Sequence, residues 1–316
     1  MKIDIVTPAV PGSQKGNRVT AMRWAEILGE LGHEVVLGQR YNGKPVDLLV
    51  ALHARQSADS VERFRRKYPR APLIVALTGT DVYGDLQASE VVLTSLELAS
   101  AIVTLQPLAI AELPEALRSK ATAIYQSAES PREAGTPVED AFEVCVVGHL
   151  REVKDPFRTA EAVRLLPSSS RARVLHLGAA LTEDMAGRAR SEEGANPRYH
   201  WLGERPRLEA SRILRSSRLL SLTSRTEGGA NVVSEALAAS VPVVSTRIAG
   251  SIGILGENYP GYFPVGDTQA LAALLLRAET DSVFYADLKA CCKQVMWRVE
   301  PARERAAWDG LLRRLC

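Results

Sequence analysis

The sequence has few of the features that mark secreted, membrane-spanning or nucleic-acid-binding proteins. Its four cysteines in 316 residues show neither CxxC nor zinc-ligand spacing, so we expect no disulfide framework. No apolar run approaches the length of about 18 residues that a membrane-spanning helix needs. The formal net charge is only +2, and no block of lysine and arginine stands apart from acidic residues, which excludes a nucleic-acid or membrane partner. We therefore expect a globular protein of the cytoplasm.

Metal binding is not expected either. The five histidines form no set with carboxylates at ligand spacing. Cys145 lies in the apolar stretch FEVCVV and is typical of a small buried hydrophobic residue, while the adjacent Cys291 and Cys292 fit helix packing better than redox chemistry. The amino-terminal MKIDIVTPAV predicts a strand followed by a proline loop rather than a signal peptide. The sequence therefore predicts no metal and no cofactor.

What the sequence does contain is a regular alternation of short apolar runs and helical patterns. Hydrophobic residues make up 46% and charged residues 24% of the chain, which is an ordinary globular composition. The length suffices for two domains with a core each, and the alternation predicts parallel sheets of the α/β class. In the first part of the chain the expected strands are 2–7, 33–37, 47–52, 73–77, 101–105 and 122–126.

A polar stretch separates this first series of strands from a second. Residues 127–140, SAESPREAGTPVED, contain Pro131, Gly135 and Pro137 and show no periodicity, so we expect them to link two domains. The second series comprises FEVCVV, ARVLHLG, RYHWLGE, RLLSL and VPVVST. We place the domains at 1–130 and 140–300, followed by a helix over 301–316 that carries Trp308, Leu311, Leu312 and Leu315 on one face.

The most informative segment lies late in the second series. Residues 218–222 and 241–246 are short apolar strands, and 232–239 between them has helical composition, so the segment predicts a strand, a glycine loop, a helix and a strand. In open α/β sheets, ligands bind at the carboxyl ends of the strands. The loop before the helix is therefore a candidate ligand site.

The glycine loop itself suits an anion. Gly228 and Gly229 allow the backbone to approach a phosphate more closely than any side chain would, and Ala230 and Asn231 lead into the helix, whose first amides are free to donate. The sequence thus predicts phosphate contacts at these four residues.

Two glutamates flank this loop eight positions apart, Glu227 before it and Glu235 in the helix. The spacing alone is weak evidence, because Glu26 and Glu34 have the same separation on what is expected to be protein surface. A carboxylate is nevertheless a strong hydrogen-bond acceptor for sugar and ribose hydroxyls. A plain βαβ unit with solvated carboxylates is the alternative.

The phrase EGGANVVSEALAASVPVV resembles the family-4 group of retaining GT-B glycosyltransferases. The resemblance implies two Rossmann-like, doubly wound domains facing one another across a cleft, an acceptor-binding one followed by one that binds a nucleotide sugar. It also implies that the final helix crosses back to the amino-terminal domain. Glu235 would then hold the ribose, and Glu227 would be the catalytic contact to the donor sugar and its developing oxocarbenium charge. GT-B enzymes generally work without a metal.

The first loop, PAVPGSQKGNR, is the expected acceptor site. In the resembled family this loop reaches into the cleft, which implies contacts from Gly12, Gly16 and Asn17. The helix that begins near Asn17 would offer its amides to an anion, and Lys15 and Arg18 are cations suited to phosphate. A tight turn with no ligand is the alternative for the glycines.

The stretch VVGHLREVKDP is the expected diphosphate clamp. Many family members have an arginine where this chain has His149, and a lysine where this chain has Lys154. Half of the clamp is therefore altered, and either His149, while neutral, or the nearby Arg151 would substitute. By the same resemblance, Gly203 and Glu204 in the loop after RYHWLGE are expected near the nucleotide base.

The stretch ALTGTDVYGDL follows the fourth expected strand and places Thr78, Gly79, Thr80 and Asp81 at its carboxyl end. Relatives often have a sugar-contacting histidine in this region, and this chain has none. Asp81 would take part of that role or would cap the next turn. His53, after the third strand, is a second catalytic candidate.

Three phrases extend the resemblance to a smaller group. LTGTDVYGDL, TEGGANVVSEALA and STRIAGSIGILGENYPGYFPVGDTQAL look like the selenosugar synthases of selenoneine biosynthesis. That likeness implies transfer of N-acetylglucosamine from UDP-N-acetylglucosamine to selenophosphate. The alternatives are a family-4 transferase with a hydroxyl or thiol acceptor, a UDP-sugar epimerase or hydrolase, and a noncatalytic nucleotide-sugar-binding protein. The oligomeric state is not indicated.

Overall fold

The computed structural model describes residues 1–84, 86, 88–129 and 136–315. The chain divides into two compact units. The amino-terminal unit comprises Met1–Ser127, Glu227–Gly229 and Glu300–Cys316, and the carboxyl-terminal unit comprises Ala128–Thr226 and Ala230–Val299. The chain thus leaves the amino-terminal unit at the start of the expected linker. The expected boundary at residue 130, and the expected linker residues at 131 and 135, lie outside the described residues.

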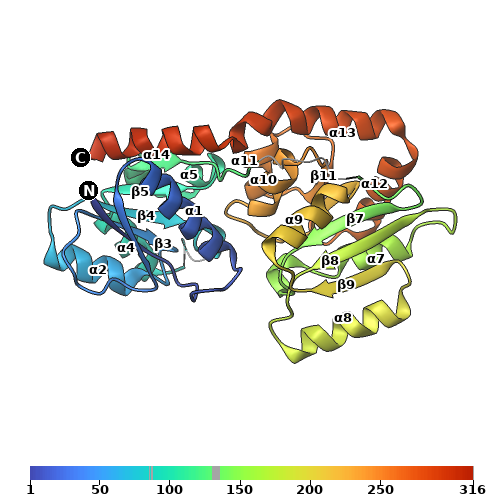
Figure 1. Cartoon of the computed structure of the whole chain (residues 1–316), viewed down its shortest axis with the longest axis horizontal. Coiled ribbons are helices and arrows are strands. Elements are labelled where there is room, and N and C mark those ends of the chain that lie inside the picture. Colours follow the sequence, from blue (N-terminus) through green and yellow to red (C-terminus); the bar gives the residue numbers. More distant parts are fainter. Residues whose placement is uncertain (85, 87, 130–135, 316) are drawn as a thin grey trace. The chain divides into compact units, whose positions relative to one another are not determined.

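The amino-terminal unit is built on a six-stranded parallel sheet with the order β2-β1-β3-β4-β5-β6 (Figure 1). The strands are β1 (Lys2–Val6), β2 (Glu34–Gly38), β3 (Leu48–Leu52), β4 (Leu73–Leu77), β5 (Ala101–Thr104) and β6 (Ala121–Ala123). The helices are α1 (Gly16–Glu30), α2 (Ala58–Lys67), α3 (Thr80–Tyr83), α4 (Glu90–Leu98), α5 (Leu108–Glu112), α6 (Glu115–Arg118) and α14 (Pro301–Leu315).

Helices cover both faces of this sheet because its strands are apolar on both sides. Leu49 and Ala51 of β3 belong to the core formed with α2 and α4. Leu48, Val50 and Leu52 belong to the opposite core, formed with α1 and α14. Successive side chains of a strand point to opposite faces, so a run of buried leucine and valine predicts a sheet that is covered twice.

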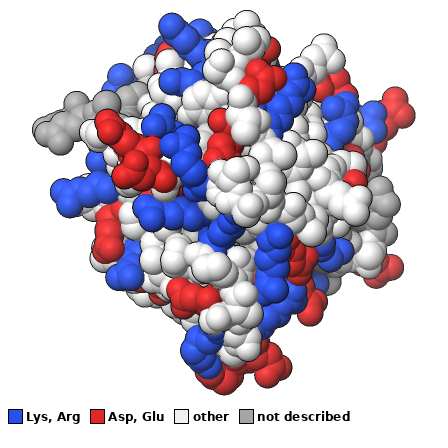
Figure 2. Space-filling view, turned by 90° about the vertical axis from the view of Figure 1, so that its right-hand side faces the viewer, with Lys and Arg blue, Asp and Glu red and all other residues white. Residues whose placement is uncertain are grey.

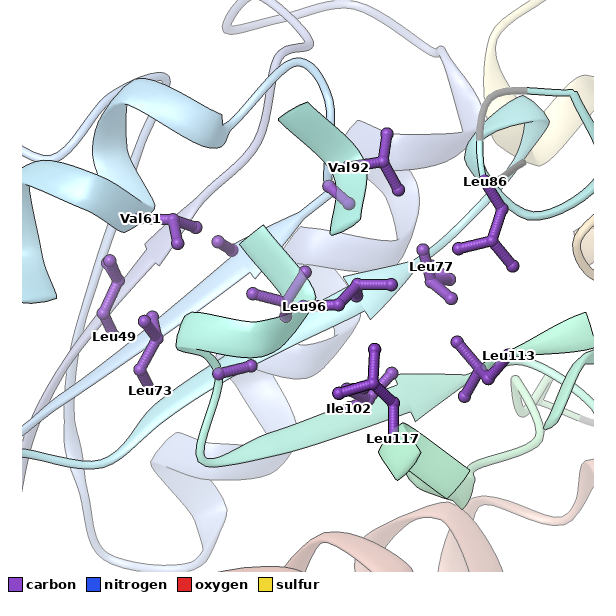
Figure 3. Close-up of a cluster of buried hydrophobic side chains, with 14 of the residues drawn as sticks. Leu49, Val61, Leu73, Leu77, Leu86, Val92, Leu96, Ile102, Leu113 and Leu117 are labelled. Atoms are coloured by element: carbon purple, nitrogen blue, oxygen red, sulfur yellow. The ribbon is translucent and has the colours of Figure 1, made fainter. Parts of the chain in front are cut away.

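The core under α2 and α4 is drawn in Figure 3. Leu49 and Leu73 of neighbouring strands lie beside Val61 of α2, and Leu96 of α4 lies close to Ile102 of β5. All five side chains have no exposed surface. Burying a side chain of this size stabilises a fold by about 1.5–3 kcal/mol. These side chains therefore hold α2 and α4 against the sheet.

The carboxyl-terminal unit has a second six-stranded parallel sheet, with the order β12-β11-β10-β7-β8-β9. The strands are β7 (Phe142–Val147), β8 (Ala172–Leu177), β9 (Tyr199–Gly203), β10 (Leu219–Leu222), β11 (Val243–Thr246) and β12 (Tyr262–Phe263). The helical segments are η1 (Glu152–Lys154), α7 (Arg158–Arg164), α8 (Glu183–Ala195), α9 (Arg207–Ser216), α10 (Asn231–Ala238), α11 (Ala249–Leu255), α12 (Thr268–Thr280), α13 (Ser282–Val295) and η2 (Met296–Val299).

Two details differ from the sequence prediction. The edge strand β12 was not predicted, because Tyr262 and Phe263 give a run of only two residues. The strand expected at 122–126 ends at Ala123, and the residues that follow it leave the sheet. One of them, Gln126, makes side-chain contacts that are described below.

Each sheet reverses its strand order at one point, and such a point is the usual ligand site of an open α/β sheet. In the carboxyl-terminal unit β8 and β9 lie on one side of β7, whereas β10 pairs with its other side through Leu219↔Val144 and Leu220↔Cys145. In the amino-terminal unit the reversal lies between β1 and β3. The loops after β7, β10, β1 and β3 are therefore candidate ligand-binding loops.

Candidate functional site

A pocket of the carboxyl-terminal unit lies at the reversal between β7 and β10. It is lined by Gly148 at the end of β7, by Thr223 and Ser224 after β10, and by Lys154 and His176. Lys154 was expected in a phosphate clamp, and the structure brings it to the edge where a ligand of such a sheet binds. The lining thus combines one cation, Lys154, with hydroxyl, backbone and apolar groups.

Hydrogen bonds join the two loops that form this pocket. The hydroxyl of Thr223 donates to the carbonyl oxygens of Lys154 and Asp155, each at 2.9 Å. The backbone N–H of Arg225 donates to the carbonyl of Val153 at 2.8 Å. Asp155 adopts a left-handed conformation with φ of 44°, which is uncommon outside glycine and typical of functional or tightly held positions. The backbone that carries Lys154 is therefore fixed by the loop after β10.

His149 is held by the neighbouring loop after β8. Its Nδ1 accepts a hydrogen bond from the backbone N–H of Ala179 at 3.1 Å, so in the neutral ring the proton is on Nε2. A Cβ at Gly178 would lie 1.9 Å from the carbonyl oxygen of Gly148, which shows how closely the two loops pack. Arg151 is exposed and does not line the pocket, so of the two proposed clamp substitutes His149 lies in the more constrained position.

His176 contacts the loop after β7 through the carbonyl oxygen of Gly148. It is fully buried, its Nδ1 lies 2.9 Å from the hydroxyl of Tyr199, and its Nε2 lies 3.3 Å from the carbonyl oxygen of Gly148. Burial lowers the pKa of His176 to about 4, so the ring is neutral at pH 7, with Nε2–H donating to Gly148 and the tyrosine hydroxyl donating to Nδ1. The sequence did not predict a role for His176.

Helix α10 presents two polar side chains on one face. Asn231 and Glu235 are four residues apart and remain partly exposed, while the helix positions between them are buried, and residues at this spacing lie on the same side of a helix. Ala230, at the N-cap of α10, makes no side-chain capping bond, and no acidic residue lies in the first turn of this helix. By contrast, Asp267 and Asp281 cap α12 and α13.

The segment Glu227–Gly229 packs within the amino-terminal unit. A Cβ at Gly228 would lie 2.9 Å from the backbone nitrogen of Gly79, and one at Gly229 would lie 2.6 Å from Cβ of Leu105. These distances are too short for any side chain, so close packing explains both glycines without a ligand. Glu227 itself is partly exposed beside this contact.

Asp81 and His53 form a buried pair at the carboxyl ends of β3 and β4. The carboxylate of Asp81 accepts backbone hydrogen bonds from Gly79 at 2.7 Å, Ala54 at 3.0 Å and Thr78 at 3.1 Å. Burial raises its pKa, and His53 and these amides oppose that rise. The side chain of Asp81 has no exposed surface and holds the backbone that leads into α3, while its expected contact with a sugar stays a prediction.

His53 is 4% exposed and has a left-handed φ of 69°, a conformation that costs free energy in a non-glycine residue. Its Nε2 accepts from the side-chain amide of Gln56 at 3.3 Å, so the ring proton is on Nδ1, 3.7 Å from the Asp81 carboxylate. This distance is too long for a hydrogen bond. His53 thus packs beneath the loops of this edge.

The loop after β1 and the first turn of α1 contain side-chain donors that have no acceptor among the described residues. Nε and Nη1 of Arg18 and the hydroxyl of Ser13 are shielded from solvent and form no hydrogen bond within the described part of the chain. Gly12 has φ of 80° and completes a turn in which the N–H of Ser13 donates to the carbonyl of Val10 at 3.2 Å. Gly12 therefore lies in a turn, and its contact with an acceptor stays a prediction. Buried unpaired donors of this kind usually have a partner that is absent.

The other residues predicted to contact the acceptor or the nucleotide base lie in loops or at the ends of strands and helices. Lys15 is exposed and precedes α1, which begins at Gly16 and Asn17 without a side-chain cap. Gly203 ends β9 with φ of 69°, and Glu204 after it is exposed. Gly79 lies in the loop that Asp81 holds, and Thr80 begins α3. These positions leave the expected base and acceptor contacts as predictions.

Figure 2 shows lysine and arginine interspersed with aspartate and glutamate over the face it draws. Within residues 1–84, 86, 88–129 and 136–315, no three His, Cys, Asp or Glu side chains gather closely enough to hold a metal ion. None of the described helices has both the length and the apolar character needed to cross a bilayer.

Comparison with known proteins identifies a family. The family model described as "Glycosyl transferases group 1" matches residues 127–294, just over half of the chain. No curated protein matches the sequence.

Several solved structures share the fold over most or all of the chain. Anabaena HepE in complex with UDP-glucose has a TM-score of 0.80 and 16% identity, covering 99% of this chain and 100% of that one. Sucrose-phosphate synthase from Thermosynechococcus elongatus has a TM-score of 0.78 and 14% identity, with coverage of 99% and 98%. A UDP-forming trehalose-phosphate synthase from Burkholderia xenovorans has a TM-score of 0.69 and 14% identity, with coverage of 85% and 73%. The predicted GT-B fold class, with two doubly wound α/β sheets, is confirmed.

Proposed function

This chain belongs to the glycosyl transferases group 1 family and is a glycosyltransferase, and we propose that it transfers N-acetylglucosamine from UDP-N-acetylglucosamine to selenophosphate. The class of reaction follows from the family. The UDP-sugar donor is supported by the structures of HepE, which are described as complexes with UDP, with UDP and glucose, and with UDP-glucose. The particular sugar and acceptor are proposed from the sequence resemblance and from the donors of Ser13 and Arg18 that lack an acceptor among the described residues.

The pocket between β7 and β10 supports binding of the donor in the carboxyl-terminal unit. Lys154 lines it, and the uncapped start of α10 offers backbone amides to negative charge. As UDP leaves, its diphosphate gathers charge that a lysine and a helix N-terminus stabilise. Neutral His149 donates from Nε2 where other family members have an arginine, and Glu235 accepts hydrogen bonds from the ribose hydroxyls.

Glu227 is assigned to the donor sugar. A carboxylate there accepts hydrogen bonds from sugar hydroxyls and opposes the positive charge that develops at the anomeric carbon as the bond to UDP breaks. The Glu227–Gly229 segment has a backbone fixed by close packing, which suits a residue that must be held in one place.

The acceptor assignment is supported by unpaired donors of Ser13, in the loop after β1, and of Arg18, in the first turn of α1. Arg18 has two guanidinium nitrogens, and Ser13 a hydroxyl, that are shielded from solvent and lack acceptors among the described residues. Leaving a charged donor buried and unpaired is costly, and a phosphate-like anion supplies the missing oxygens. A guanidinium binds such oxygens in pairs.

In the proposed reaction, the selenium of selenophosphate attacks the anomeric carbon and forms the C–Se bond. The C–O bond to UDP breaks, and its electron pair leaves with the diphosphate oxygen. Water then cleaves the P–Se bond, giving inorganic phosphate and the selenosugar. Because selenium is already anionic, the attack needs little help from a general base, which agrees with the buried, structural positions of His53 and Asp81.

The proposal is tested by mass spectrometry of products. A panel of UDP-sugars is incubated with selenophosphate, thiophosphate and neutral alcohols, and we expect a selenosugar from UDP-N-acetylglucosamine and selenophosphate. Arg18→Ala should raise KM for selenophosphate about tenfold or more and leave KM for the UDP-sugar nearly unchanged, because one charged contact is lost. Arg66→Ala, which removes an exposed arginine of α2, is the matched control and should behave like the wild type.

Each other outcome points to a different function. Product formation with alcohols or thiols alone would replace selenophosphate by an ordinary acceptor. Release of free sugar without any acceptor would favour a hydrolase. Binding of UDP-sugars with no turnover in any mixture would contradict the assigned reaction.

A further inference from the structure

Gln126, in the segment that follows β6, is buried at 4% exposure and has hydrogen-bond partners on both sides of its amide. Its Oε1 accepts from the hydroxyl of Thr20 and from Nη2 of Arg23, each at 2.8 Å. Its Nε2 donates to the carbonyl oxygen of Gly229 at 2.9 Å. Because both partners of Oε1 are donors, the orientation of the amide is determined by its surroundings.

The other end of this contact is anchored in the core of the amino-terminal unit. Nε of Arg23 donates to Oε2 of Glu304 at 3.0 Å, and the indole N–H of Trp24 donates to Oε1 of Glu304 at 2.7 Å. The backbone N–H of Ser127 donates to Oε2 at 2.7 Å. Glu304 is 1% exposed. Helix α1, helix α14 and the chain after β6 therefore meet at one buried carboxylate.

The hydrogen bond from Gln126 to Gly229 adds to close packing around the Glu227–Gly229 turn. The backbone of Thr78 and Gly79 packs against Gly228, and the side chain of Leu105 packs against Gly229. These contacts are only steric. The bond from Gln126 to the Gly229 carbonyl is directional, and it lies two residues from Glu227.

We propose that Gln126 is a positioning residue for catalysis, which holds the Glu227–Gly229 turn so that the Glu227 carboxylate meets the donor sugar. This inference rests on the proposed contact between Glu227 and that sugar. A glutamine is required because the position needs an acceptor toward Thr20 and Arg23 and a donor toward Gly229. A displacement of a catalytic group by about 1 Å can lower a rate a hundredfold, so a single buried amide is sufficient to control activity.

The test is Gln126→Glu. A carboxylate keeps both acceptor contacts and pairs with Arg23, but it cannot donate and it repels the Gly229 carbonyl. We expect kcat to fall about tenfold or more, with Kd for UDP within about twofold of the wild type, because Lys154 and Glu235, the side chains assigned to UDP, are not part of the Glu227–Gly229 turn. Ser127→Ala is the matched control, since it removes a hydroxyl bond to Glu304 and leaves the Gln126 amide intact. It should lower Tm without lowering kcat.

A double-mutant cycle with Glu227→Gln separates this inference from the proposed function. If Gln126 acts through Glu227, the double variant should lose no more activity than Glu227→Gln alone. Should Gln126→Glu fail to fold, Gln126→Met, of similar length and without charge, replaces it in the same cycle. Full activity of Glu227→Gln would overturn the proposed role of Glu227. Impaired Glu227→Gln together with an unimpaired Gln126 variant, or losses that simply multiply, would overturn the positioning role.

Discussion

At the scale of single residues, His176 shows how burial fixes a loop. The folded protein keeps this imidazole neutral between the hydroxyl of Tyr199 and the carbonyl of Gly148. An isolated histidine in a strand gives no sign of this in the sequence, because its role depends on which loop comes to lie above it. Lys154 was predicted by its place in a motif, and the structure puts it in the pocket.

The state of His176 predicts a dependence of stability on pH. Its pKa is lowered from 6.5 to about 4, so between these values the unfolded chain binds a proton that the folded chain does not. The free energy of unfolding must therefore decrease as pH falls from about 6.5 to about 4, by about 3 kcal/mol from this group. Below about pH 4 the loss is complete.

The measurement is urea unfolding from pH 7 to pH 4, followed by hydrogen exchange in peptides of the carboxyl-terminal unit. His176→Gln, which cannot titrate, should be less stable at pH 7 because the fit to Tyr199 and Gly148 is lost, but its stability should fall less steeply toward acid. Parallel pH profiles for the two proteins would show that His176 contributes nothing to the slope.

At the scale of elements, α14 was predicted as an amphipathic helix, and Trp308, Leu311 and Leu312 are indeed buried in the core with α1. The ring of Trp308 lies 4.8 Å from that of Trp24, edge to face. The polar half of the contact was not predicted. In the sequence, Glu304 is a charged residue of a helix, which predicts a position on the surface. Only the tertiary fold brings Arg23, Trp24 and Ser127 around it.

Glu304→Ala should destabilise the amino-terminal unit strongly. The substitution removes the acceptor that Nε of Arg23 and the indole N–H of Trp24 share, and removing one partner of a buried ion pair costs about 3–5 kcal/mol. Chemical denaturation measures the loss. Glu30→Ala is the control, because it breaks an exposed ion pair with Arg305 on the same two helices, which is worth at most about 1 kcal/mol. Equal losses in the two variants would contradict the buried network.

The strands were largely predictable, because each buried parallel strand is a continuous apolar run. The predicted strand boundaries were wrong where the apolar run was short or where it continued beyond the last residue of the strand. Thr122–Gln126 was expected to be one strand, yet the sheet ends at Ala123, and Gln126 instead turns its amide to Thr20, Arg23 and Gly229. Periodicity cannot reveal such a contact, since the partners are about a hundred residues apart.

At the scale of the whole molecule, alternation of strands and helices was sufficient to predict two doubly wound sheets, and the structure has them. The assignment of Glu227–Gly229 to the amino-terminal unit was not predictable, because the segment lies between elements of the other unit in the sequence. The chain therefore places the two flanking glutamates differently. Glu227 belongs with the first sheet, and Glu235 belongs with the second.

In the proposed function, this glycosyltransferase binds a UDP-sugar through the carboxyl-terminal unit, with Glu235 on the ribose and Lys154 on the diphosphate. Calorimetric titration of UDP into the wild type, Glu235→Ala, Lys154→Ala and Arg66→Ala tests it most directly. Loss of a charged hydrogen bond of about 1–3 kcal/mol predicts that Glu235→Ala and Lys154→Ala each weaken UDP binding by about 5- to 150-fold. Arg66→Ala should bind like the wild type. Unchanged UDP affinity in both the Glu235 and the Lys154 variants, or no UDP binding by the wild type, would contradict the account.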